Sequence, residues 1–210
     1  MRLLLASGSP RRRELLERLG LDFHFVAPDV DESRFPEEPP AAYVERVARA
    51  KAEAVAGRGL IVVAADTTVV HEGRVMGKPG HPEEARSMLR RLQGDVHEVF
   101  TGLAVSGWDE GAQTKSVVDI AQVALVPMTE EEIAWYVGTG EPLDKAGAYA
   151  LQGRGGMFVS GVVGSPFTVI GLPIHLLARL VSASGADLSE LMTGADRQLL
   201  GRRPVASDPD

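Results

Sequence analysis

Apolar residues along the chain form two kinds of pattern, and each pattern predicts one kind of secondary structure. Leu3–Ala6 and Leu60–Val70 are runs rich in apolar and β-branched residues, typical of strands buried on both faces of a sheet. In Pro40–Ala56, apolar side chains recur every three or four residues, which predicts an amphipathic helix. Another helix is predicted to begin at Pro10, because Ser9 before a proline is a good N-cap pair.

The same patterns predict further elements and the turns between them. His71–Arg74 is typical of a hairpin turn, and Gly140–Gly153 predicts turns that lead into a strand of small residues. Gly102 interrupts one strand and indicates a bulge or a close approach of another backbone. The remaining predicted elements are strands over Asp22–Val26, Val96–Ser106 and Thr114–Val126, and helices over Pro82–Leu92, Thr129–Val137 and Pro173–Ser182.

Composition narrows the class of protein. The chain has 210 residues, 44% of them hydrophobic, and a net charge of −7, which disfavours non-specific binding to nucleic acid or to an anionic membrane. It has no cysteine, which excludes disulfides, a thiolate nucleophile and cysteine-ligated metals. The first apolar run is too short for a signal peptide and no segment is long enough to span a bilayer, so we expect a cytoplasmic protein. The histidines show no metal-binding spacing, and we expect His71, His81 and His97 at the surface.

The first strand leads through Ser-Gly-Ser-Pro into a helical turn that carries three arginines. The helix dipole disfavours positive charge there, whereas a bound phosphate would satisfy both the arginines and the free backbone N–H groups. Arg12 lies three, four and seven residues before Leu15, Leu16 and Leu19, so it shares their inward face. We therefore favour a phosphate site at Arg12 over a solvated basic patch, and we expect Arg13 to be surface charge.

Two further charged residues occupy unusual positions. Lys51 falls on the apolar stripe of the helix over Pro40–Ala56, where a lysine either snorkels, has a buried partner or enters a cleft. The chain has 18 arginines and only four lysines, which favours the cleft. Asp66 follows the apolar run from Leu60, and ligands of α/β sheets collect at strand ends, so we favour a functional carboxylate over a structural one. It is not a helix cap, because no helical pattern begins at Thr67.

Two loops add weaker candidates. Gly77-Lys78-Pro79 lacks the serine or threonine and the upstream glycine of a Walker A motif, but Lys78 could still reach a phosphate. The acidic loop over Asp29–Glu32 is by itself more typical of a solvated loop than of a metal site. It becomes a candidate site only if it faces the arginines.

Four strings occur together in this chain: Leu5–Arg12, Ala65–Thr67, Gly77–Pro79 and Gly140–Gly153. In order and spacing they resemble the Maf family of nucleoside triphosphate pyrophosphatases, over about Leu3 to Ser184. The resemblance implies an α/β fold with an elongated mixed central β-sheet and flanking helices, in two lobes around a cleft, like the inosine-triphosphate pyrophosphatases. Residues 1–193 would form this single domain, with 194–210 as a frayed tail.

The resemblance also implies roles for individual residues. Asp66 would be the proton acceptor, and a divalent cation, Mg²⁺ or Mn²⁺, would be held by Glu32 and Asp66. The phosphate-binding residues would be Ser7, Arg12, Lys51 and Lys78. The branch of the family that acts on dTTP and UTP is similar to this chain at Arg11, Thr67 and Gln152, where the 7-methyl-GTP branch is expected to differ. Residues 165–168 depart from a Ser-x-x-Asn pattern that many members have.

These implications leave a definite expectation and two alternatives. We expect hydrolysis of dTTP and UTP, and of modified pyrimidine nucleotides, to the monophosphate and pyrophosphate, in the service of nucleotide-pool sanitation. The alternatives are a 7-methyl-GTP pyrophosphatase and a non-catalytic nucleotide sensor that regulates cell division. The family further implies a homodimer, and no nucleic acid or membrane partner is expected.

Overall fold

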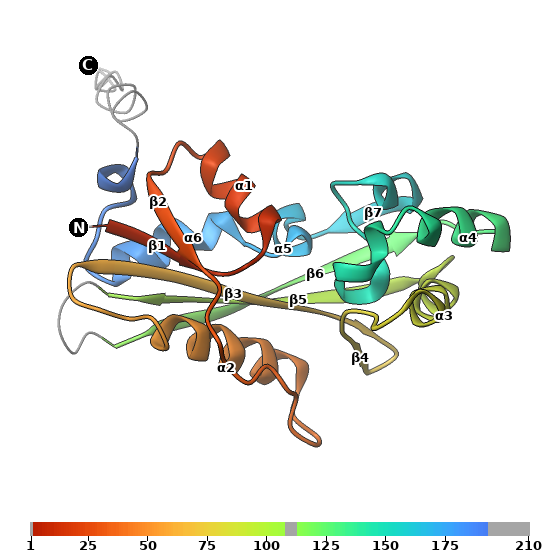
Figure 1. Ribbon diagram of the computed structural model, residues 1–210, viewed down its shortest axis with the longest axis horizontal. Coiled ribbons are helices and arrows are strands. Elements are labelled where there is room, and N and C mark those ends of the chain that lie inside the picture. Colours follow the sequence, from red (N-terminus) through yellow and green to blue (C-terminus); the bar gives the residue numbers. More distant parts are fainter. Residues whose placement is uncertain (1, 108–112, 193–210) are drawn as a thin grey trace, which may run out of the picture.

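A single β-sheet runs the length of this elongated molecule, and helices flank it at both ends (Figure 1). The computed structural model describes residues 2–107 and 113–192. Within this part of the chain the sheet is mixed and seven-stranded, in the order β2-β1-β3-β5-β6-β7, with β4 also paired to β3. The predicted α/β fold with a mixed central sheet is confirmed. The strands are β1 (Arg2–Ala6), β2 (Phe23–Val26), β3 (Leu60–His71), β4 (Arg74–Met76), β5 (Val96–Ser106), β6 (Lys115–Leu125) and β7 (Val159–Val163).

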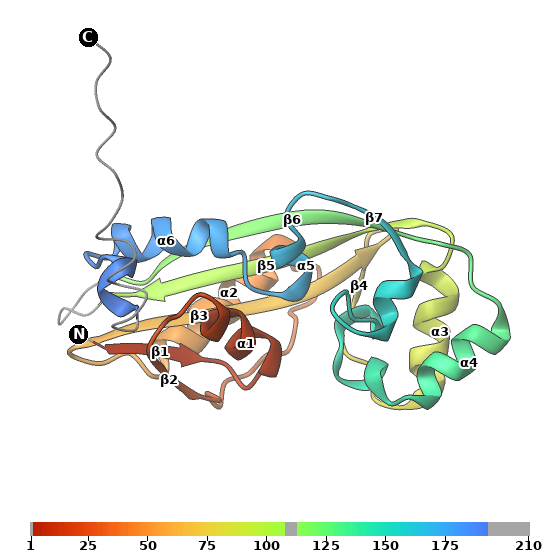
Figure 2. The same cartoon turned by 90° about the horizontal axis from the view of Figure 1, so that it is seen from above.

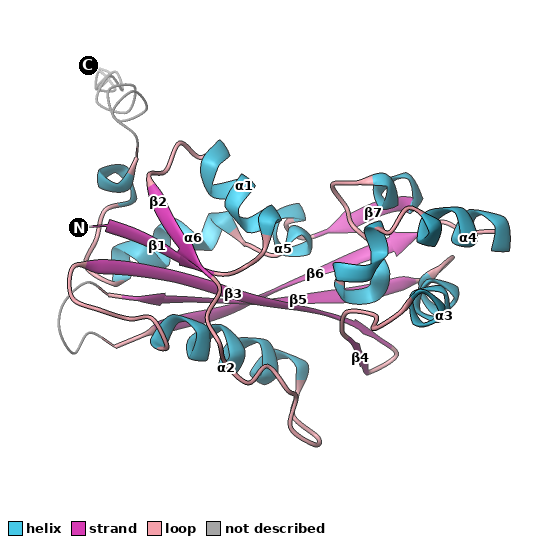
Figure 3. Cartoon of the chain, in the orientation of Figure 1, coloured by secondary structure: helices cyan, strands magenta, loops and turns pink. Residues whose placement is uncertain are grey.

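The helices gather into two lobes, joined by the long strands β3, β5 and β6 (Figures 2 and 3). The first lobe holds β1 and β2 with α1 (Pro10–Arg18), α2 (Pro40–Glu53) and α6 (Ile174–Ala183). The second lobe holds β4 and β7 with α3 (Pro82–Leu92) and α4 (Glu130–Gly138), while α5 (Pro166–Ile170) lies between the lobes. The 3-10 helices are η1 (Glu141–Asp144), η2 (Ala146–Ala148), η3 (Arg154–Phe158) and η4 (Leu188–Leu191). No helix of the described residues has the length and apolar character needed to cross a membrane.

Strand β3 is buried on both faces in its first half, as its apolar run predicts. Ile61, Val63 and Ala65 belong to a core cluster with α1 and α6, whereas Val62 and Ala64 pack against α2 on the opposite face. This alternation follows from the two-residue period of a strand. It assigns Asp66 to the α2 face and Thr67 to the α1 face.

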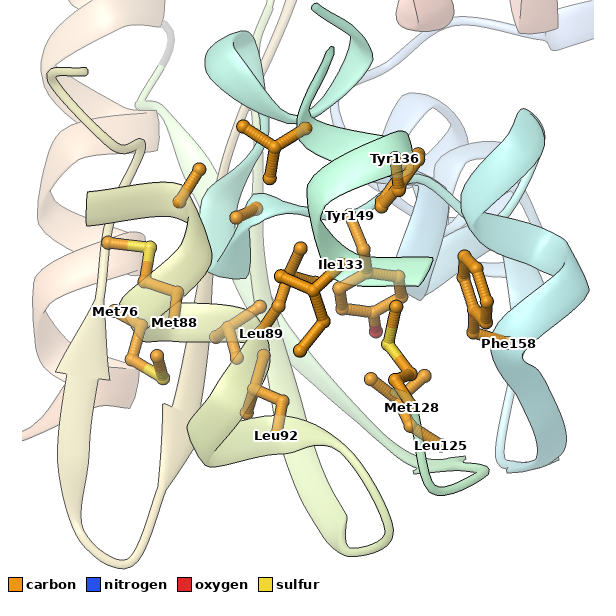
Figure 4. Close-up of a cluster of buried hydrophobic side chains, with 14 of the residues drawn as sticks. Met76, Met88, Leu89, Leu92, Leu125, Met128, Ile133, Tyr136, Tyr149 and Phe158 are labelled. Carbon is orange, nitrogen blue, oxygen red and sulfur yellow. The ribbon is translucent and has the colours of Figure 1, made fainter. Parts of the chain in front are cut away.

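The second lobe has its own core, built from α3, α4 and the far halves of the long strands (Figure 4). Figure 4 shows Met76, Leu89, Ile133, Tyr149 and Phe158 converging in this cluster. The two lobes therefore have separate cores over a shared sheet. This arrangement leaves a space between them on the side of β3 that faces β1 and β4.

That space begins where β1 ends. Strand β1 pairs in parallel with β3 over residues 60–63, and β4 pairs with β3 only over residues 69–71. Between these two partners, no strand of the described chain pairs with residues 64–68 on this side, although β5 covers the other side throughout. The sequence analysis placed Asp66 at the end of its own strand, which is wrong. Asp66 lies within β3, and it is β1 that ends beside it.

Several other sequence predictions also need correction. The small-residue strand predicted before Gly153 is absent from the described residues, and 3-10 helices take its place. Gly147 and Ala148 have positive φ angles of 68° and 59°, which no strand accommodates. His71 and His97 are buried rather than exposed, because alternate positions of β3 and β5 face the core. The frayed tail over 194–210 and most of the Gly107–Gly111 turn lie outside the described residues.

Gly102 marks a close approach between α2 and the sheet, one of the two possibilities that its position in β5 indicated. A Cβ atom on Gly102 would lie 2.3 Å from the carbonyl oxygen of Val44 and 2.8 Å from the backbone nitrogen of Glu45. Gly102 is also the β5 partner of Asp66. The missing side chain therefore lets α2 lie directly over the strand pair that carries Asp66.

We predict that Gly102→Ala lowers the free energy of unfolding by about 1–3 kcal/mol, because α2 must move away from the sheet. Gly138→Ala is the matched control, since a Cβ atom on Gly138 would meet nothing within 4 Å. Urea denaturation of both variants measures the difference. Equal stabilities of the two variants would show that this contact does not constrain α2.

Candidate active site

A cleft of about 540 Å³ lies between the lobes, at residues 64–68 of β3, which have no partner strand on one side. Its lining comes from the β1–α1 turn, α2, the middle of β3, the residues after β4, and the segment around η1 and η2. Every residue that the sequence analysis singled out for a role lines this one cleft. These residues are Ser7, Arg11, Arg12, Glu32, Lys51, Asp66, Thr67, Lys78 and Gln152.

Arg12 is buried at the floor of the cleft and is held in a fixed orientation. Its Nε donates to the Gly171 carbonyl at 2.7 Å, Nη1 to Ser7 Oγ at 3.0 Å and Nη2 to Thr67 Oγ1 at 3.1 Å. Burial lowers the pKa of Arg12, and the nearby Asp66 carboxylate opposes that shift. A guanidinium stays charged in proteins, so this site presents a desolvated positive charge with two N–H donors left over.

Lys51 reaches the cleft from the opposite face of the sheet, on the inward stripe of α2. Its ammonium lies 2.8 Å from Asp66 Oδ1 and 2.9 Å from Glu32 Oε2. Lys51 and Asp66 are 6% and 7% exposed, so neither charge is solvated by bulk water and each depends on the other. The sequence analysis made the acidic loop a candidate only if it faces the arginines. Glu32 pairs with Lys51 rather than with an arginine, but it lines the same cleft as Arg11 and Arg12. Glu32 is held there partly by Tyr43, whose hydroxyl donates to the Glu32 carbonyl at 2.9 Å.

The second lobe supplies the other wall of the cleft. Lys78 follows β4, is exposed, and has no hydrogen-bond or ion-pair partner among the described residues. Across from it, Asp144 of η1 contacts Arg11 Nη1 at 3.4 Å and also pairs with Lys145. Arg11 lies in the first turn of α1, so this contact joins the two lobes over the cleft. Gln152 is exposed at the same wall.

The comparison with known families identifies this arrangement. A family model described as Maf-like protein matches residues 2–184. The chain belongs to the Maf family. Among curated Maf relatives, the dTTP/UTP pyrophosphatase of Anaeromyxobacter sp. (strain Fw109-5) is 52% identical over 190 residues, covering 89% of this chain and 91% of the relative. The protein of the same name from Myxococcus xanthus (strain DK1622) is 47% identical, covering 89% and 94%.

Likeness to solved structures is more distant. The Staphylococcus aureus Ham1 protein is 15% identical, with a TM-score of 0.47, covering 87% of this chain and 99% of that one. At this distance the likeness adds nothing about substrate or chemistry. The Maf assignment rests on the sequence match alone.

Several lining residues were missed by the sequence analysis of this Maf chain. Tyr43, Tyr149, Asp144 and Lys145 all line the cleft. The scarcity of lysine was a usable signal for Lys145, because three of the four lysines line the cleft and the fourth, Lys115, lies at an exposed end of β6. Asp144 and Tyr149 gave no periodic signal, because Asp144 lies in the short 3-10 helix η1 and Tyr149 directly follows η2.

The carboxylates of this cleft suit a divalent cation only if substrate phosphates complete its set of ligands. No cluster of three or more histidine, aspartate or glutamate side chains suited to a metal occurs in the described part of the chain. Glu32 and Asp66 both pair with the ammonium of Lys51, so the two carboxylates face the same small volume. Mg²⁺ is commonly bound by one or two carboxylates together with substrate phosphates, and this donor set matches that mode. The metal itself stays a prediction.

Tyr149 contacts a buried histidine, His97, beneath the cleft. Its hydroxyl lies 2.8 Å from His97 Nε2, and the two rings meet edge to face. Burial, helped by the nearby His71, lowers the pKa of His97 from 6.5 to about 4, although Asp95 opposes the shift. The His97 ring is therefore neutral at pH 7 in the folded protein.

We predict that this buried ring makes the protein acid-sensitive. The unfolded chain protonates His97 below about pH 6.5, whereas the folded chain does so only near pH 4. Stability is therefore lost as the pH falls through this window, by about 2 kcal/mol between pH 7.5 and pH 5. Denaturation at the two pH values, compared with His97→Gln, measures the effect. Between pH 7.5 and pH 5, the His97→Gln variant should lose about 2 kcal/mol less stability than the wild type. Equal losses in the two proteins would contradict the assignment of the acid sensitivity to His97.

Proposed function

We propose that this Maf chain hydrolyses dTTP and UTP to the nucleoside monophosphate and pyrophosphate. The observation that supports this most strongly is the convergence of Arg12, Lys51 and Lys78 on one cleft that also holds a buried carboxylate. The cations approach from both faces of the sheet and from both lobes. A triphosphate carries enough charge and length to engage all of them at once. The names of the close relatives supply the two nucleotides.

In the proposed reaction, water attacks the α-phosphorus and the bond to the α–β bridging oxygen breaks. Pyrophosphate leaves with that oxygen, and the proton of the attacking water passes to Asp66. Lys51 holds Asp66 through Oδ1, which leaves Oδ2 to face the water. Arg12 and Lys78 neutralise the charge that develops on the leaving oxygens. Phosphate oxygens compete with Glu32 and Asp66 for Lys51, so substrate binding loosens the hold on the base.

A divalent cation held by Glu32, Asp66 and phosphate oxygens would supply Lewis acidity and lower the pKa of water. That help matters because an ordinary aspartate has a pKa of about 4, which is low for a base at neutral pH. Mg²⁺ and Mn²⁺ are the ions we propose. Cytoplasmic location and the homodimer also stay predictions.

The three proposed specificity residues are placed differently in the cleft. Gln152 is exposed at the wall of the second lobe and can offer both a donor and an acceptor to a pyrimidine edge. Thr67 Oγ1 instead accepts from Arg12 and shares a hydrogen bond of 2.9 Å with Thr101. Thr67 would therefore influence the nucleotide by holding Arg12. Arg11 would act at the junction of the lobes, next to Asp144.

We predict that, in a panel of nucleoside triphosphates, UTP and dTTP give the highest kcat/KM and release pyrophosphate rather than orthophosphate. Separate assays for the two products make the measurement. A higher kcat/KM for 7-methyl-GTP would contradict the proposed substrates and favour a 7-methyl-GTP pyrophosphatase. Nucleotide binding without pyrophosphate release would favour a non-catalytic sensor.

We predict that Asp66→Asn lowers kcat for UTP by roughly 10²–10⁴-fold, because the amide keeps the shape and an acceptor for Lys51 but cannot take the proton. Nucleotide affinity, measured by calorimetry, should change little. Asp22→Asn serves as the control, since Asp22 is exposed and lies outside the cleft. A near-normal rate in Asp66→Asn would remove Asp66 from the role of base.

A further inference from the structure

A row of polar side chains crosses the sheet at the boundary between the two cores. Thr67 of β3 lies opposite Thr101 of β5, and Thr101 lies opposite Asp119 of β6. Thr101 is fully buried, yet the proposed mechanism gives its hydroxyl no role. Burying a hydroxyl costs free energy unless it is hydrogen-bonded, so its partners show what it does. The rows on either side on this face are apolar, one in each core: Ala65 with Leu103, and Val69 with Val99.

Helix α5 lies against this row, between the two lobes (Figure 2). The Thr101 hydroxyl donates to the Thr168 carbonyl at 2.8 Å, and the Thr168 hydroxyl donates to the Asp119 carboxylate. Thr168 is fully buried, and it closes the segment 165–168 that departs from the Ser-x-x-Asn pattern. This one residue ties α5 to both β5 and β6, so its carbonyl is a fixed point.

The Thr168 carbonyl sets the direction of every hydrogen bond along the row. A carbonyl oxygen only accepts, so Thr101 gives its single hydroxyl proton to Thr168. The 2.9 Å hydrogen bond between Thr67 and Thr101 must then be donated by Thr67. With its proton used, Thr67 accepts the N–H of Arg12 Nη2 at 3.1 Å. The buried chain of hydrogen bonds therefore begins at Arg12 in the cleft and ends on α5.

The end of α5 also holds Arg12 directly. Gly171, the C-cap of α5, accepts from Arg12 Nε at 2.7 Å. A Cβ atom on Gly171 would lie 3.0 Å from Thr67 Oγ1 and 3.5 Å from Arg12 Nη2, so this backbone packs closely on their contact.

These contacts reach the guanidinium group itself and therefore fix its orientation. A guanidinium is planar, so acceptors held at both Nε and Nη2 fix its plane and the directions of its remaining N–H donors. A phosphate is bound most strongly when two such donors point at it in parallel. The orientation of Arg12 thus depends on Thr67, and that of Thr67 depends on Thr101.

We propose that Thr101 is a positioning residue for phosphate binding, which fixes the Arg12 guanidinium through Thr67 and is itself anchored on the Thr168 carbonyl. This proposal rests on the proposed function in assigning substrate phosphates to Arg12. Thr101 is not among the residues that line the cleft, so it acts only through its neighbours. Without the Thr101 hydroxyl, Thr67 is free to turn its own hydroxyl toward the cleft, and Arg12 loses an acceptor of fixed direction.

The test measures the binding of inorganic tripolyphosphate, which has phosphates but no base, by calorimetry. Thr101→Val keeps the shape of the side chain and removes only the hydroxyl. We expect it to raise the dissociation constant about tenfold, because a hydrogen bond to a charged group commonly contributes that much. Thr101→Ser keeps the hydroxyl and should stay within about twofold of wild type. Thr114→Val is the matched control, since Thr114 is a buried threonine that does not line the cleft.

A double-mutant cycle separates positioning from general loss of structure. If Thr101 acts through Arg12, Thr101→Val should change the tripolyphosphate constant by less than about twofold in an Arg12→Lys background. A substitution that merely loosens the fold would weaken binding by the same factor in both backgrounds. Thr168→Val approaches the row from its other end, since it frees α5 from Asp119 and leaves the Thr101 hydroxyl in place. We expect it to raise the constant about threefold, and it decides the matter if Thr101→Val does not fold.

The outcomes separate this proposal from the proposed function. Unchanged tripolyphosphate binding in the folded Thr101→Val variant would overturn the proposal, and so would equal effects of this substitution in the two backgrounds. An equal rise in the Thr114→Val control would overturn it as well. A wild type that releases no pyrophosphate from any nucleotide would instead contradict the proposed function. The binding measurements need no turnover, so they would still decide the role of Thr101.

Discussion

The ion pair between Lys51 and Asp66 is the interaction on which the site depends. Both side chains are buried where β3 has no neighbouring strand on the side of β1 and β4, and they lie 2.8 Å apart. Burying one such charge alone is strongly unfavourable, so each holds the other in place. Lys51 also contacts a second carboxylate, Glu32, so these three side chains together carry one excess negative charge. The positive charge of Arg12, on the opposite face of the sheet, balances it.

The two lobes divide the work in this account. The first lobe positions the buried groups, Arg12, Lys51 and Asp66. It does so through the close approach of α2 at Gly102 and through the hydrogen bonds of Arg12 to three separate segments of the chain. The second lobe carries exposed groups, Lys78 and Gln152, on short segments without long strands or helices. Chemistry common to all nucleotides would thus reside on rigid elements, and choice of base on the segment between η2 and η3 that carries Gln152.

Sequence periodicity predicted the parts of the site that lie on regular elements. The phases of Arg12 and Lys51 placed both on inward helix faces, and both line the cleft. Periodicity could not show that β3 continues past Asp66 while the neighbouring strand β1 ends beside it. The end of β1 depends on a pairing between segments that are distant in the sequence. Periodicity also misjudged His97, since a histidine near a turn gives no sign that its strand position faces the core.

The most direct test of the central claim is a crystal structure with the α,β-imido analogue of UTP, which resists cleavage between the α- and β-phosphates. The account predicts that the phosphates lie among Arg12, Lys51 and Lys78, with the α-phosphorus facing Asp66 and the uracil edge against Gln152. A nucleotide bound elsewhere, or one whose α-phosphate lies far from Asp66, would contradict it.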